Sequence, residues 1–199
     1  MLRGAHAGRV RREPFRGARH TVDNIRRLAL ECQEHYPLRL LAEEIVGHLE
    51  SKDYLSEILA VYHWVLGHTR YANDPRNVEL VRSPREVLER LIRRWPQIQR
   101  VAEQILSVAK GTSRWRPSLD CDDLVCLMVG LFVCLGRQVE IVTVAFQRSV
   151  VNGERQFSHV LLRVTEPRTG NKIILDPVAA EDTAAMLARV VDAQIWAVA

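Results

Sequence analysis

Residues 119–136 read LDCDDLVCLMVGLFVCLG and change from an acidic start to a run that is apolar on almost every side. An aspartate ahead of such a run is a good helix N-cap, and a glycine after it is a good C-cap. The stretch therefore predicts a helix that begins at Cys121, after an Asp120 cap, and ends before Gly136. A helix that is apolar all round is buried on all sides, so we expect this one at the centre of the core.

The sequence before this helix has apolar residues at helical spacing, interrupted by proline and polar breaks. Thr21 is a candidate N-cap for the first of these helices. Ser83, Pro84 and Glu86 have the spacing of a capping box with proline at the first helical position. The pattern predicts helices over residues 21–36, 37–49, 53–68, 84–95 and 97–109.

After Gly136 the pattern changes to short β-branched and apolar runs bounded by turn residues, which is typical of antiparallel strands. These runs are VEIVTVAF (139–146), FSHVLLRV (157–164) and KIILD (172–176), and a helical pattern returns over residues 181–196. The expected fold class is α+β, with N-terminal helices and a central buried helix packed on an antiparallel sheet.

The chain has 199 residues and 47% hydrophobic residues, which suits one globular domain. Its net charge is +4, but residues 1–20 alone carry six arginines and one glutamate, so the remainder is slightly acidic. We expect residues 1–20 to be a flexible basic tail and residues 21–199 to be the domain. Such a tail is either a solvated leader or a docking segment for nucleic acid or another acidic surface.

The four cysteines show no C-x-x-C pair, which argues against a disulfide framework or a zinc ribbon. No segment approaches the roughly 20 apolar residues that span a bilayer, and the N-terminus lacks the apolar part of a secretory signal. The sequence therefore predicts a cytoplasmic protein without a membrane partner.

Cys121 falls on the first turn of the central helix, where free backbone N–H groups and the helix dipole favour an anion. A thiolate is such an anion, and helix N-termini lower cysteine pKa values. Asp122 and Asp123 act in the opposite direction, because their negative charge opposes ionisation of the thiol. The position alone leaves open whether Cys121 is reactive.

His159 and Asp176 lie on two consecutive strands joined by the turn EPRT. If the hairpin closes with an even loop of two or four residues, the two side chains lie directly opposite each other on one face. A three-residue loop with a bulge at Gly170 would instead turn Asp176 to the other face. The even loop suits a carboxylate that orients an imidazole.

Cysteine in DCDD, histidine in SHVLL and aspartate in ILDP, in that order, resemble the transglutaminase-like superfamily of papain-like folds. The upstream segment AVYHWVLGHTRYANDP resembles the helix that in this family ends in a tyrosine, here Tyr71. The segment VELVRSPREVLE resembles bacterial and bacteriophage members. The similarity covers about residues 55–178.

The resemblance implies a catalytic triad without a cofactor, acting on amide groups of proteins or peptides. By position, Cys121 is the nucleophile, His159 the general base and acid, and Asp176 the residue that holds the imidazole. Two features depart from the family. Leu119 stands where a glycine is usual, and the helix over residues 97–109 is additional.

Further candidates lie near the same cleft. Tyr71 and Trp115 can donate a hydrogen bond to an oxyanion, although both suit packing equally, and Asp120 is placed at the cleft. A metal site of Asp120, Asp122, Asp123 and His159 is disfavoured, since successive aspartates on a first helical turn point in different directions and usually cap. The alternative to an enzyme is a structural or assembly module of a phage-type particle that keeps the fold.

Overall fold

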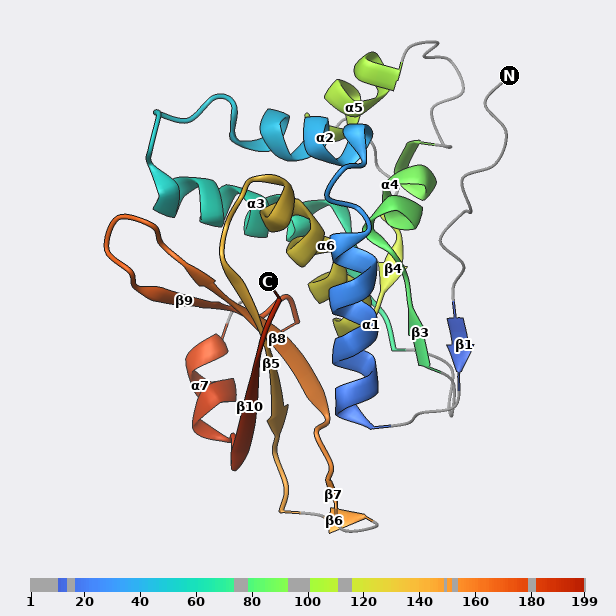
Figure 1. The fold of residues 1–199 in the computed structure, drawn as a ribbon, viewed down its shortest axis with the longest axis vertical. Helices are drawn as coiled ribbons and strands as arrows, with labels where there is room; N and C mark the ends of the chain where they lie inside the picture. Colours follow the sequence, from blue (N-terminus) through green and yellow to red (C-terminus); the bar gives the residue numbers. More distant parts are fainter. Residues whose placement is uncertain are drawn as a thin grey trace.

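The structure of the protein is a computed structural model that describes residues 11–13, 17–73, 79–92, 101–110, 116–148, 150–151, 154–178 and 182–198 (Figure 1). The helices in these ranges are α1 (Ala18–Leu30), α2 (Tyr36–Val46), α3 (Tyr54–His68), α4 (Pro84–Ile92), α5 (Val101–Ala109), α6 (Cys121–Cys134) and α7 (Thr183–Ala188). The strands are β1 (Arg11–Glu13), β2 (Arg70–Tyr71), β3 (Glu79–Val81), β4 (Ser118–Leu119), β5 (Val139–Ala145), β6 (Val150–Val151), β7 (Glu154–Arg155), β8 (His159–Thr165), β9 (Lys172–Leu175) and β10 (Asp192–Ala197).

Helix α6 is the central helix, as its apolar sequence predicts. It contacts α1, α2, α3 and α4 as well as strands β5 and β8, and ten of its residues from Asp123 to Phe132 are buried. A Cβ atom at Gly130 would lie 2.6 Å from the Pro84 side chain, so glycine allows α4 to approach α6 closely. Gly136 follows α6 with φ 67°, the left-handed conformation that glycine adopts without strain.

The main sheet is antiparallel with strand order β10-β5-β8-β9. Helix α6 packs on one face of it, and α7 lies on the other side of the sheet in Figure 1. A second small cluster of buried residues joins this other face to α7: Val142, Val144, Leu161 and Met186. The strands expected over 139–146, 157–164 and 172–176 are confirmed, and the α+β class is shown by this arrangement of helices and sheet.

The C-terminal helix expected over 181–196 is wrong in its second half. Helix α7 ends at Ala188, and β10 pairs with β5 in the register Trp196↔Ile141. Strand β5 would otherwise be an open edge of the sheet, and backbone pairing along a β-branched strand outweighs the weak helical pattern of the segment.

The N-terminal elements begin earlier than the sequence predicts. Helix α1 starts at Ala18 after Gly17, and Thr21, the expected cap, lies inside the helix on its buried side. Residues 11–13 form β1, which pairs antiparallel with β3. Described structure therefore extends into the segment expected to be a flexible tail, while residues 1–10 and 14–16 lie outside the described residues.

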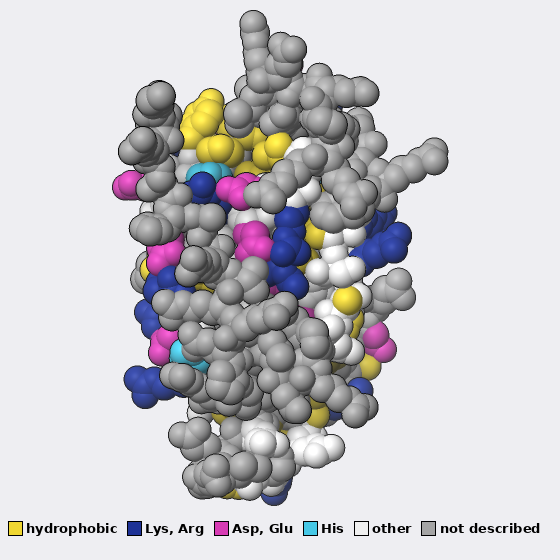
Figure 2. All heavy atoms as spheres, turned by 90° about the vertical axis from the view of Figure 1, so that its right-hand side faces the viewer, with side chains coloured by type: hydrophobic (Ala, Val, Ile, Leu, Met, Phe, Trp, Pro, Cys, Tyr) yellow, Lys and Arg dark blue, Asp and Glu magenta, His cyan; other side chains and the backbone are white. Residues whose placement is uncertain are grey.

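On the face shown in Figure 2, described Lys and Arg side chains lie among Asp and Glu side chains. Arg3, Arg9 and Arg16 of the basic N-terminal segment are outside the described residues, as is Trp115. Among the described helices, none has the length and apolar content needed to cross a membrane.

Candidate functional site

Cys121 is the first residue of α6, and its helix start is defined by the cap that the sequence predicts. The Asp120 carboxylate accepts a hydrogen bond from the backbone N–H of Asp123 at 3.0 Å. Because this cap satisfies one of the free N–H groups of the first turn, Asp120 has a structural role in holding Cys121 in place.

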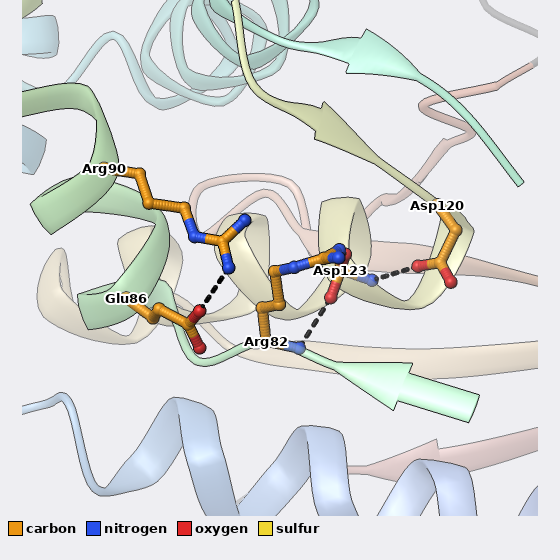
Figure 3. Close-up of polar contacts among 5 residues, drawn as sticks. All are labelled: Arg82, Glu86, Arg90, Asp120 and Asp123. Atoms are coloured by element: carbon orange, nitrogen blue, oxygen red, sulfur yellow. Dashed lines mark hydrogen bonds and ion pairs between the residues drawn. The ribbon is translucent and has the colours of Figure 1, made fainter. Parts of the chain in front are cut away.

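Asp123 ties the start of α6 to the segment between β3 and α4 (Figure 3). Its Oδ1 accepts a hydrogen bond from the backbone N–H of Arg82 at 2.6 Å, and its Oδ2 forms an ion pair with the Arg82 guanidinium. The Asp123 side chain is fully buried. Nearby, Arg90 and Glu86 pair along α4. The disfavoured metal set is therefore engaged in protein contacts throughout: Asp120 and Asp123 as described here, Asp122 with the Cys121 thiol and His159 with Asp176.

Tyr71 lies on β2, beside the short strand β4 that precedes Asp120 and Cys121. Strands β2 and β4 pair in parallel with Tyr71 opposite Leu119, and the N–H of Ala72 donates to the Leu119 carbonyl at 2.8 Å. The Tyr71 side chain is 46% exposed, and its hydroxyl donates to Asn73 Oδ1 at 2.6 Å. Partial burial and the nearby Cys121 raise the pKa of Tyr71, so its hydroxyl remains a donor at neutral pH.

The β8–β9 hairpin closes with an even loop, one of the two alternatives that the sequence leaves open, but the loop is centred one residue later than the middle of EPRT. Leu162 pairs with Leu175, and the N–H of Glu166 donates to the Asn171 carbonyl at 2.8 Å, which leaves the four residues 167–170 as the loop. The Glu166 carboxylate accepts hydrogen bonds from the N–H groups of loop residues 168 and 169 and so stabilises this turn.

This register places His159 and Asp176 as diagonal neighbours on one face of the sheet, so the expected direct opposition is wrong. The shifted loop moves Asp176 two residues along, opposite the position of Leu161. The two side chains still meet, because His159 Nε2 and Asp176 Oδ2 are 2.9 Å apart. Diagonal neighbours are within reach of side chains of this length.

Asp176 is fully buried and held at three atoms. Its Oδ2 contacts His159, and its Oδ1 accepts a hydrogen bond from the N–H of Val178 at 2.8 Å. Its backbone carbonyl accepts a hydrogen bond from the hydroxyl of Tyr62 on α3 at 2.7 Å. Buried carboxylates are costly without such partners, and here each part of the residue has one.

An aromatic side chain covers His159. The Phe146 ring stacks on the imidazole, with centroids 6.2 Å apart and planes at 24°, and the Arg189 guanidinium lies 5.4 Å from the Phe146 centroid. The imidazole is 11% exposed. Phe146 therefore covers part of the imidazole, and only a small part of the His159 side chain is open to water.

Cys121 and His159 line the same cavity of about 270 Å³. Its remaining walls come from α1, β5 and the start of β8: Ala18, Thr21, Asp122, Thr143, Phe157, Ser158 and Val160. The contribution of α1 was not expected, because no pattern within α1 indicates that it packs beside a residue one hundred positions away. A larger cavity, about 770 Å³, lies among α2, α3 and α5 and includes none of the candidate residues.

The resting form of Cys121 is the neutral thiol. Burial raises the pKa of Cys121 far above its usual value, and the carboxylates of Asp122 and Asp120 raise it further. The thiol donates to Asp122 Oδ1 at 3.6 Å, while the N–H of Val160 partly offsets the increase. The lowered pKa expected from the helix terminus is therefore absent, because burial outweighs the dipole.

Comparison of the chain with protein-family models, curated proteins and solved structures finds no match.

Proposed function

We propose that the protein is a cysteine-dependent enzyme that transfers or hydrolyses acyl groups of protein or peptide amides. Cys121 is the nucleophile, His159 the general base and acid, and Asp176 the residue that orients the imidazole. The observation that carries the proposal is that Cys121 and His159 line one cavity, while Asp176 Oδ2 lies 2.9 Å from Nε2 of the His159 imidazole.

The proposed chemistry starts from a neutral thiol. Since Nε2 of His159 contacts Asp176, the tautomer with a proton on Nε2 leaves Nδ1 free to act as a base. As Sγ of Cys121 bonds to the carbonyl carbon, Nδ1 takes the thiol proton. It then gives this proton to the leaving amine as the C–N bond breaks. Water or a second amine then attacks the thioester carbonyl and gives a proton to Nδ1; the C–S bond breaks, and Sγ of Cys121 takes that proton back.

The arrangement of elements supports a transglutaminase-like, papain-like fold as part of this proposal. A central helix begins at the cysteine; of two antiparallel strands downstream, the first begins at the histidine and the second ends one residue before the aspartate. Tyr71 on β2 pairs with Leu119, the residue that precedes Asp120.

Acylation by p-nitrophenyl acetate tests the chemistry without a known substrate. We expect a burst of nitrophenolate and one acetyl group on Cys121, detected by intact and peptide mass spectrometry. Cys121→Ala should abolish both. Cys134→Ala is the matched control, because Cys134 is the partly buried cysteine at the other end of α6. Acetylation of both cysteines at equal rates, or full turnover by Cys121→Ala, would contradict the proposal.

One observation favours the alternative of a non-catalytic structural or assembly module. Burial and the carboxylate of Asp122 hold Cys121 as a thiol, which on its own makes a poor nucleophile. The acylation experiment separates the two functions, because a structural module gives no burst and no site-specific acetyl adduct on Cys121.

A further inference from the structure

Tyr62 lies at the middle of α3 and points at the backbone of Asp176, 114 positions later in the chain. Its side chain is 8% exposed, and its hydroxyl donates to the Asp176 carbonyl at 2.7 Å. Burial and the charge of Asp176 raise the pKa of Tyr62, so the hydroxyl keeps the proton that it donates.

The Tyr62 hydrogen bond lies where the pairing of β8 with β9 ends. The last residue pair of the β8–β9 ladder is Leu162↔Leu175, so Asp176 is the first residue beyond it. A buried backbone carbonyl that has left the ladder needs another donor. Tyr62 supplies that donor, and α3 thereby holds the backbone from which the catalytic carboxylate extends.

We infer that Tyr62 is a positioning residue of the His159–Asp176 pair. This inference rests on the proposed function. The carboxylate holds the imidazole through one oxygen, because Asp176 Oδ1 is engaged with the N–H of Val178. A shift of the Asp176 backbone therefore changes the contact with His159 directly, and misplacement by about 1 Å can reduce a catalytic rate by roughly a hundredfold.

The test is Tyr62→Phe, which removes one oxygen and keeps the ring. The matched control is Tyr54→Phe on the same helix, where the tyrosine ring lies against the Arg137 guanidinium, away from the pair. Two readouts are compared: the imidazole N–H signal of His159 in ¹H NMR with ¹⁵N-labelled protein, and the burst rate with p-nitrophenyl acetate. Circular dichroism and thermal unfolding establish that both variants are folded.

We expect Tyr62→Phe to shift the His159 N–H signal, to speed its exchange with water and to lower the burst rate about tenfold, within the range that misplacement produces. Tyr54→Phe should leave both readouts unchanged. An unaltered His159 signal in a folded Tyr62→Phe variant, or equal changes in the control, would overturn the inference.

The NMR signal does not depend on acyl transfer, so the two proposals can fail separately. A shifted signal in Tyr62→Phe together with no burst in the wild-type protein would support the geometric role of Tyr62 and refute the proposed function. A strong burst that depends on Cys121 but is unaffected by Tyr62→Phe would support the function and refute the positioning role.

Discussion

The two ends of helix α6 carry the same residue type in different surroundings. Cys121 at the first position lies in a cavity with His159, close to the carboxylates of Asp120 and Asp122. Cys134 at the last position faces the C-terminal end of α1, where its thiol contacts the Cys32 carbonyl at 3.8 Å. Burial raises the pKa of both thiols, that of Cys134 to about 11. The difference between them is therefore the base beside Cys121, and not an intrinsically acidic thiol.

The largest effect is expected from a change at Asp176, the partner of the His159 base. Asp176→Asn keeps the shape of the side chain but can present its amide to the imidazole and select the wrong tautomer. We expect the burst rate with p-nitrophenyl acetate to fall by roughly 10³- to 10⁴-fold with little change in unfolding temperature. Asp182→Asn is the control, because Asp182 caps α7 at an exposed site and asparagine caps equally well. A rate within threefold of wild type would remove Asp176 from the mechanism.

The second prediction concerns the ion pair that anchors the N-terminal end of α6. Asp123→Ala leaves the largely buried Arg82 guanidinium without its partner, so the free energy of unfolding should fall by about 3–5 kcal/mol. Urea unfolding followed by circular dichroism measures this change. Asp122→Ala, one residue earlier and partly exposed, should cost less than about 1 kcal/mol. Equal losses in the two variants would show that the Arg82 contact is not the anchor.

The Asp122 carboxylate raises the pKa of Cys121, so Asp122→Asn should lower that pKa and increase the thiolate fraction at any pH below it. Alkylation of Cys121 by iodoacetamide should then begin at a pH lower by up to about one unit, a change of about 1.4 kcal/mol. Cys134 in the same sample is the internal control. A Cys121 profile that moves to higher pH would contradict the assigned effect of Asp122.

The smallest effect is expected at the wall that α1 contributes. Ala18→Leu adds volume beside Cys121 in the 270 Å³ cavity and should slow alkylation of Cys121 by N-ethylmaleimide severalfold. The control is Ala60→Leu, because Ala60 lines the separate cavity at α3. Ala29→Leu would not serve, because Ala29 is fully buried. If Ala18→Leu alkylates at the wild-type rate, reagents reach the thiol from another side.

Several parts of the site follow from local sequence. The central helix, its start at Cys121 and its Asp120 cap are encoded by the change from acidic to apolar residues over 119–136. The parity of the β8–β9 loop was left open by the sequence, between an even loop and a bulged three-residue loop. The structure has an even loop, which places His159 and Asp176 on the same side.

The exact register was not predictable from the turn sequence. A register shift of two residues keeps every side chain on the same face of the sheet. The hydrophobic pattern therefore cannot distinguish the expected loop position from the observed one. The hydrogen bonds from the backbone of residues 168 and 169 to the Glu166 carboxylate favour the observed turn. The sequence left the direction of the Cys121 pKa open, since the helix terminus and the nearby carboxylates are visible in the sequence but the extent of burial, which raises the pKa, is not.

Local sequence patterns specify the α+β class and the central helix that begins at Cys121, because periodicity and capping depend on residues within a few positions. Long-range packing places β10 at the edge of the sheet, Ala18 at the cavity and the Tyr62 hydroxyl on the Asp176 backbone. Each of these contacts joins segments many residues apart. Their partners are set by how the whole chain packs around α6, which no local pattern encodes.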